Sequence, residues 1–365
     1  MRTFFQRWAR LTGSQVRELL KINPSDRRWQ MPVAAALATG LPLLIGACFD
    51  RLDYGLASSL GGLVFIYLPA TPLSHRMVTL MGCAFGLSGC YTLGLLSHFF
   101  PWSMVPALVF TTAVVTMVCR FYRIGMPGSL FIIMAGTIGM YTPLDDPLEV
   151  PLWVGLVAMG ALLAFLIGFL YSLYALRLEA PQPAQPAVAS FDFVVFDSLL
   201  IGVFVGLSLA VAQLLQLEKP YWVPVSCLAV IQGASLRAVW NRQLQRVLGT
   251  GIGLLVAWGM FLLPLNKWAV PFLMMLLCFI VETAVVRHYA FAAIFITPMT
   301  ILLAEAATLS SSSAAALIEA RFYDTLLGCL VGLLGALCLH NPHFRRWLGE
   351  PLRRLIPPGF RSGAA

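Results

Sequence analysis

Two acidic side chains lie inside long apolar stretches of this 365-residue sequence. Glu282 lies deep within the stretch 268–286, and Asp197 lies near the start of the stretch 193–217. A carboxylate within a membrane segment is expensive and marks a functional site by default. Burial favours the protonated carboxyl group and a nearby cation favours the charged one, so an acid under both influences can exchange a proton. Glu282 and Asp197 are therefore candidates for proton coupling, and a static salt bridge to another segment is the alternative.

A second group of residues combines aromatic rings with arginines. An aromatic carboxylate needs a flat apolar wall and a planar cation, and the guanidinium fork of arginine can bind both carboxylate oxygens. The candidate substrate-binding residues are Tyr221, Trp222, Pro224, Gln232, Arg237, Arg242 and Arg246. We expect the aromatic pair near the outer end of a short helix and the arginines in a loop at its inner mouth, where they would collect anions. An interfacial aromatic belt with cytoplasmic arginines is the alternative.

The sequence shows no pattern that indicates an enzyme. No Ser, His and Asp set typical of nucleophilic catalysis is visible. The eight cysteines lie in apolar stretches, without a CxxC motif or a Cys/His metal spacing. The glycine-rich segments lack the Gly-Lys-Ser/Thr of a phosphate loop. We therefore predict no catalytic residue, no metal site and no cofactor.

The composition indicates a membrane protein, with 59% hydrophobic and 11% charged residues and a mean hydropathy of +0.83. Soluble domains carry about 25% charged residues, and each membrane crossing needs about twenty apolar residues. Continuous apolar runs indicate helices, since backbone groups in lipid must find partners within their own segment. The runs are 29–49, 55–70, 77–96, 102–119, 125–141, 152–176, 193–217, 221–231, 247–263, 268–286, 291–306 and 322–339. The predicted fold class is an all-α polytopic membrane protein with about twelve transmembrane helices.

The basic residues predict how the chain is oriented. With a cytoplasmic N-terminus, most of the 24 Lys and Arg residues fall on the cytoplasmic side, and the positive-inside rule then places both termini there. The proline-containing stretch 177–190 becomes a cytoplasmic linker. The formal net charge of +8 fits anionic lipid headgroups as partners, and no nucleic acid is expected. Amphipathic segments at both ends are expected to lie on the membrane surface, with partner-binding helices as the alternative.

The two halves of the chain resemble each other at a nearly constant offset. Tyr54 corresponds to Tyr221, and Arg-Phe-Tyr at 120–122 corresponds to Arg-His-Tyr at 287–289. Each half has six runs, an even number, so both halves enter the membrane from the same side. This predicts parallel repeats that are related by an axis along the membrane normal. The predicted organisation is a cytoplasmic amphipathic segment 1–28, a six-helix repeat 29–176, a linker 177–190, a second six-helix repeat 191–340 and a basic amphipathic tail 341–365.

The segment from Pro220-Tyr221-Trp222-Val223-Pro224 to Gln245-Arg246-Val247-Leu248-Gly249-Thr250 resembles the fusaric acid resistance and aromatic acid exporter (FUSC-type) superfamily. That resemblance implies a multi-pass protein of the bacterial inner membrane that exports aromatic carboxylates or related small molecules. It also implies a periplasmic adaptor protein as a partner. Two departures stand out. The linker is short where long members carry a large cytoplasmic domain, and Tyr54 in the first half is followed by Gly-Leu-Ala instead of Trp-Val-Pro.

From these observations we predict a secondary transporter that exports small anionic or aromatic compounds, with proton coupling as a hypothesis. A passive anion channel is one alternative, and a membrane scaffold or assembly factor without transport activity is another. The expected partners are membrane lipids and a small anionic or aromatic substrate. Whether the protein forms a homo-oligomer is left open.

Overall fold

A computed structural model describes residues 24, 27–188, 190–233, 235–263, 265–305 and 314–354. Most of the predicted N-terminal amphipathic segment and the end of the predicted tail lie outside the described residues. Within them the regular secondary structure is entirely helical and contains no β-strand. The predicted all-α class is therefore confirmed.

The first half folds into helices that coincide with the predicted apolar runs. They are α2 (Gln30–Cys48), α3 (Leu52–Gly62) with the 3-10 turn η1 (Leu63–Tyr67), α4 (Leu73–His98), α5 (Met104–Phe121) after η2 (Pro101–Ser103), α6 (Leu130–Met140), and α7 (Val150–Leu178) after η3 (Pro147–Glu149). Proline at the start of η2 and of η3 fits the first helical turn, where the missing N–H is not needed.

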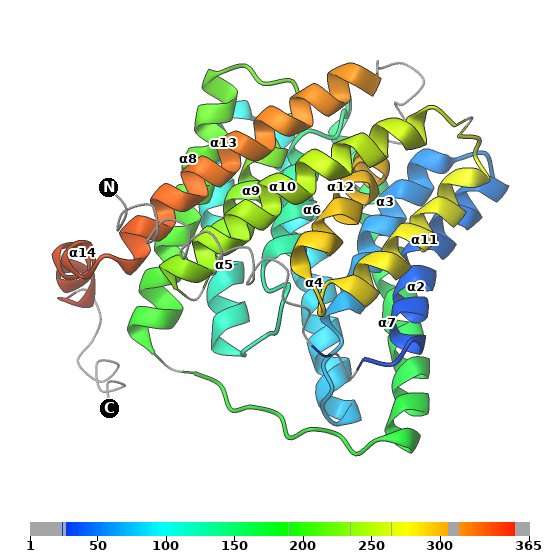
Figure 1. Ribbon diagram of the computed structural model, residues 1–365, viewed down its shortest axis with the longest axis horizontal. Coiled ribbons are helices and arrows are strands. Elements are labelled where there is room, and N and C mark those ends of the chain that lie inside the picture. Colours follow the sequence, from blue (N-terminus) through cyan, green and yellow to red (C-terminus); the bar gives the residue numbers. More distant parts are fainter. Residues whose placement is uncertain are drawn as a thin grey trace, which may run out of the picture.

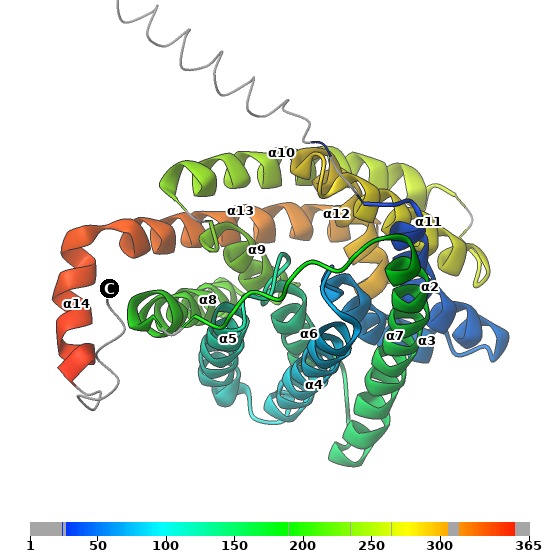
Figure 2. The ribbon, with the colours of Figure 1, turned by 90° about the horizontal axis from the view of Figure 1, so that it is seen from below.

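The second half begins after an extended segment, 179–190. Its helices are α8 (Asp197–Leu214) after the π-helical turn η4 (Phe191–Phe196), α9 (Trp222–Ile231), α10 (Leu236–Phe261), α11 (Ala269–Ala284), α12 (Tyr289–Glu305), α13 (Ala314–His340) and α14 (Pro342–Arg354). The extended segment lies against the first half, because the Gln182 amide donates to the Ala70 carbonyl (2.9 Å) and the Val188 amide to the Phe121 carbonyl (2.9 Å). Figure 2 shows it crossing the face of the helices.

One predicted boundary was wrong. The run at 247–263 belongs to a helix that begins at Leu236, so Arg237, Arg242 and Arg246 lie on α10 and not in a loop. Ser235 caps this helix, because its Oγ accepts a hydrogen bond from the Ala238 amide at 3.2 Å. The arginines are thereby fixed in helical register.

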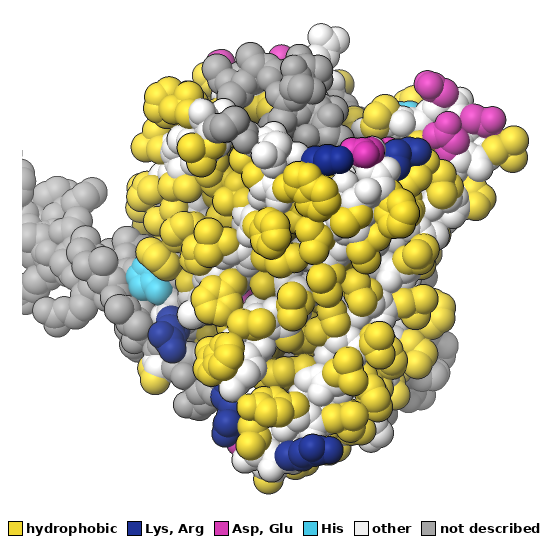
Figure 3. Space-filling model, turned by 90° about the vertical axis from the view of Figure 1, so that its right-hand side faces the viewer, with side chains coloured by type: hydrophobic (Ala, Val, Ile, Leu, Met, Phe, Trp, Pro, Cys, Tyr) yellow, Lys and Arg dark blue, Asp and Glu magenta, His cyan; other side chains and the backbone are white. Residues whose placement is uncertain are grey.

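Among the described residues, seven helical stretches are long and apolar enough to cross a membrane, and five shorter apolar helices lie among them. The seven contain α2, α4, α5, α7, α8, α10 and α13, and the shorter ones are α3 with η1, α6, α9, α11 and α12. Figure 3 shows a broad apolar face whose charged side chains gather at its upper and lower margins. Such a face suits lipid, since a soluble protein exposes no apolar patch of this extent.

The helices pack in corresponding pairs in the two halves. α4 packs on α6 as α10 packs on α12, α3 packs on α7 as α9 packs on α13, and α5 packs on α8 as α11 packs on α2. In Figures 1 and 2, α10 and α13 run side by side, with α9 against them. Gly328 permits the close approach of α13 to α9, because a Cβ atom there would collide with the Val223 carbonyl oxygen.

Candidate functional site

A cavity of about 320 Å³ lies at the centre of the molecule, between α6, α9, α10, α11, α12 and α13. We call it the central cavity. Its walls are mainly aliphatic side chains, with Phe131 and Tyr289 as aromatic members. The polar and charged side chains in its lining are Arg27, Gln232, Arg242, Arg246, Glu282, Thr300 and Arg321. Among the described residues that line it, arginines therefore outnumber carboxylates by four to one.

Two of the predicted arginines meet in this cavity. Arg242 and Arg246 are four residues apart on α10, which places them on one face of the helix. The Arg242 guanidinium lies 5.3 Å from the centre of the Tyr289 ring. Arg246 is only 4% exposed, and its Nε atom has no hydrogen-bond partner among the described residues. A buried cation is stable only beside an anion or acceptors, so the lining of this cavity suits an anionic ligand.

Glu282, the predicted proton-coupling acid of α11, is bound by an arginine from outside its own helix. Its Oε2 atom lies 3.0 Å from Nη1 of Arg27, which lies three residues before the start of α2 at Gln30. The Glu282 side chain is 4% exposed and the Arg27 side chain 30%. Both residues line the central cavity. The ion pair therefore joins the start of the first half to the middle of the second.

Arg321 of α13 forms the cavity wall at the Trp222 end. Its Nη2 donates to Oγ1 of Thr300 at 3.0 Å, and its Cζ lies 3.3 Å from the centre of the Trp222 ring. Trp222 packs in turn on Tyr221, with ring centres 5.1 Å apart. Of the predicted aromatic pair, Trp222 therefore packs against Arg321, and Tyr221 packs on Trp222. Neither of these rings lines the cavity, and Pro224 does not line it either.

A second cavity, of about 740 Å³, opens beside the central one and shares Met126 and Gln232 with it. Gln232, a predicted site residue, donates from Nε2 to the Ser129 hydroxyl at 2.8 Å. That hydroxyl lies 3.0 Å from the hydroxyl of Thr116. Gln232 is thus held at the boundary between the two cavities.

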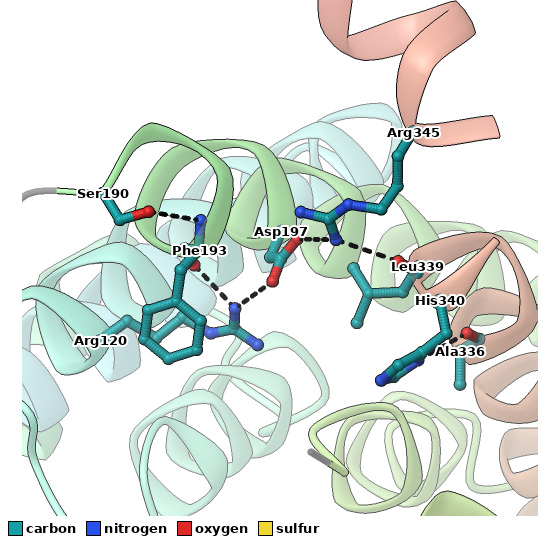
Figure 4. Close-up of polar contacts among 8 residues, drawn as sticks. All are labelled: Arg120, Ser190, Phe193, Asp197, Ala336, Leu339, His340 and Arg345. Carbon is teal, nitrogen blue, oxygen red and sulfur yellow. Dashed lines mark hydrogen bonds and ion pairs between the residues drawn. The ribbon is translucent and has the colours of Figure 1, made fainter. Parts of the chain in front are cut away.

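Asp197, the other predicted proton-coupling acid, lines this second cavity. Figure 4 shows it between two arginines. Arg120 at the end of α5 donates to Oδ2 at 2.8 Å, and Arg345 at the start of α14 donates to Oδ1 at 2.7 Å. Arg345 also donates to the Leu339 carbonyl. Asp197 therefore joins three helix ends.

The structure thus brings together only part of the predicted set. Gln232, Arg242, Arg246 and Glu282 line the central cavity, Asp197 lines the second, and exposed Arg237 lines neither. Arg27 and Arg321 are cavity residues that the sequence analysis did not single out. Arg321 directly precedes the apolar run 322–339, and this position could have identified it as a charged residue within a helix. Among the described residues, no group of three or more His, Cys, Asp and Glu side chains is arranged to hold a metal ion.

Comparison with known proteins confirms the resemblance over part of the chain. Residues 207–335 match the family described as fusaric acid resistance protein-like. The uncharacterized membrane protein YvaC of Bacillus subtilis (strain 168) is 27% identical over 160 residues, which are 43% of this chain and 25% of that protein. The chain thus spans about a quarter of the length of this curated relative. No solved structure matches. The matched region contains α9, α10 and α11, which form much of the wall of the central cavity.

Proposed function

We propose that this protein is a secondary transporter that exports small anions with a flat apolar body, of which aromatic carboxylates are the simplest class. The central cavity carries the proposal, because it combines aliphatic walls with the buried guanidinium of Arg246. The volume of about 320 Å³ lies at the lower end of the range of small-molecule sites. The match to a family of resistance proteins supports the same function.

The charge of the lining suits a carboxylate at one end of the ligand and a ring at the other. Arg242 and Arg246 offer planar donors on one face of α10, and such donors bind both oxygens of a carboxylate. Val225 and Ala229 of α9 offer the apolar contact for the ring. Binding of this kind makes and breaks no covalent bond, as transport requires.

The proposed architecture has twelve membrane-spanning helices in two parallel repeats, α2–α7 and α8–α13. The corresponding helix pairs in the two halves support it, as does the short apolar helix at the second and fifth position of each half. Both termini and the segment 179–190 lie in the cytoplasm in this arrangement. The bacterial inner membrane is the proposed location, and a periplasmic adaptor is a proposed partner.

The test is counterflow of labelled benzoate and of a panel of aromatic and aliphatic carboxylates in proteoliposomes. Arg246→Gln is expected to raise the apparent KM about tenfold or more, since a hydrogen bond between charged groups contributes about 1.5–3 kcal/mol. Arg237→Gln is the matched control on the same helix, because Arg237 is exposed and lines neither cavity. Equal flux in both variants would contradict the proposed site. A rate that never saturates with substrate would favour the passive anion channel instead.

A further inference from the structure

Arg27 lies at a boundary between two cavities. It lines the central cavity and also a cleft of about 350 Å³ beside the end of α7, and Val286 is likewise common to both. The cleft contains two further arginines, Arg28 and Arg76. An anion that entered the central cavity from this cleft would meet the Arg27 guanidinium on the way. The residue that an entering anion meets is thus the one already bound to Glu282.

The two partners of this ion pair are held very differently. Glu282 lies within α11, which packs on α2 and α12, and its side chain is 4% exposed. Arg27 lies before the first residue of α2, and its side chain is 30% exposed. Arg27 is therefore the partner that can move to another anion, whereas the Glu282 carboxylate stays where it is. Once Arg27 turns away, a buried carboxylate has lost its cation and gains a proton more readily than it stays charged.

Other titratable and charged side chains line the same cavity as Glu282. The titratable and charged side chains that share the central cavity are Arg242 and Arg246 from α10, Tyr289 from α12 and Arg321 from α13. Cys278 precedes Glu282 by one turn on α11 and carries no charge as a buried thiol. Within the part of the chain that the structure describes, Glu282 forms its ion pair with Arg27.

We propose that Arg27 exchanges Glu282 for the carboxylate of the transported anion, and that Glu282 takes up one proton in the same step. The inference rests on the proposed function. The ion pair between Arg27 and Glu282 breaks, and an ion pair between Arg27 and the substrate carboxylate forms. An O–H bond forms on Glu282 with a proton from hydronium in the bulk solvent, whose own O–H bond breaks to leave water. The charge of the cavity is the same before and after, since one negative and one positive charge enter together. This neutrality favours joint binding in a medium that penalises net charge.

The exchange fixes the sign of the coupling. Lower pH protonates Glu282, releases Arg27 and tightens anion binding, and anion binding in turn takes up a proton, because linkage between two ligands is reciprocal. Anion and proton therefore bind together and leave together, so export of the anion runs down its own concentration gradient and carries one proton outward with it.

The experiment is isothermal titration of benzoate and salicylate into the protein in nanodiscs, in two buffers of different ionisation enthalpy at the same pH. The buffer dependence of the heat gives the number of protons taken up. We expect about one proton per anion in the wild type and none in Glu282→Gln, which should still bind. Arg27→Gln should bind about tenfold or more weakly, as expected for loss of a charged hydrogen bond. Arg51→Gln is the matched control, since Arg51 lies beyond the other end of α2, pairs with Asp53 and should leave affinity and proton uptake unchanged.

The outcomes separate this inference from the proposed function. Binding without proton uptake in the wild type overturns the exchange and leaves the transporter standing. Binding of neither acid by the folded wild type overturns the proposed function. If either single variant fails to fold, the double variant Arg27→Gln/Glu282→Gln removes both charges together. Proton uptake that persists in that double variant overturns the assignment to Glu282.

Discussion

The guanidinium of Arg321 lies over the ring of Trp222, with Cζ 3.3 Å from the ring centre. Trp222 is 2% exposed, so this contact takes place away from water. A cation over a desolvated indole is stabilised by about 2 kcal/mol or more. The tryptophan therefore supports an arginine that lines the cavity.

Trp222→Phe and Trp222→Leu should distinguish the stability contributed by the aromatic ring from that contributed by the volume of the side chain. Phe retains an aromatic face and should cost little stability, whereas Leu removes the cation–π contact and leaves a cavity, with an expected cost of about 3 kcal/mol. Thermal unfolding of the purified protein in detergent measures the difference. Phe322→Leu provides the comparison, because Phe322 is exposed on the same α13 helix. Equal losses for both Trp222 variants would show that Arg321 does not need the ring.

Arg242 and Arg246 should differ in their response to salt. Arg242 is half-buried at the mouth of the cavity and Arg246 is 4% exposed, and salt screens exposed charges far more than buried ones. The KM effect of Arg242→Gln should shrink between low and high ionic strength, whereas that of Arg246→Gln should persist. Benzoate flux at several salt concentrations measures both. A salt-insensitive Arg242→Gln effect would contradict a role in collecting anions.

The ion pairs of Asp197 should behave as one structural unit. Asp197→Asn leaves Arg120 and Arg345 facing each other, and we expect a loss of about 1–3 kcal/mol in stability. Arg345→Gln in that background should cost less than it does alone, with a coupling of about 0.5–3 kcal/mol in a double-mutant cycle. Arg346→Gln is the control, because Arg346 is exposed. If Asp197→Asn instead kept its stability and lost proton-driven flux, Asp197 would be a coupling residue.

The helices were predictable and the contacts between them were not. A run such as 152–176 is apolar throughout because it meets lipid or packed side chains, so composition alone locates α7. The first turns of α10 are amphipathic, with Arg242 and Arg246 on the face towards the cavity. Because these turns are not continuously apolar, a search for apolar runs places the start of the helix too late. The Arg27–Glu282 pair spans 255 positions. No local pattern distinguishes Arg27 from the other basic residues that precede α2.

The proposed topology can be tested with a natural cysteine. Cys48, at the end of α2, is the exposed one among the eight cysteines. With a cytoplasmic N-terminus this end of α2 faces the periplasm, so a membrane-impermeant maleimide should label intact spheroplasts, and Cys48→Ser should abolish the label. A reporter fused at Gln185, in the segment between the halves, should give a cytoplasmic signal. A periplasmic signal there would contradict the twelve-helix arrangement.

Asp324 is the buried acid that no described residue neutralises by a hydrogen bond. It lies on α13 one turn after Arg321, is 1% exposed, and neither carboxylate oxygen has a hydrogen-bond partner among the described residues. A buried polar group left without a partner costs about 1–3 kcal/mol. Asp324→Asn removes the charge at nearly constant volume, so the midpoint of thermal unfolding should rise. Glu319→Gln, at an exposed position of the same helix, should leave it unchanged. A fall in the midpoint for Asp324→Asn would show that the carboxylate stabilises the fold. A rise together with a loss of flux would show that its cost is retained for transport, since stability and activity often oppose each other at functional positions.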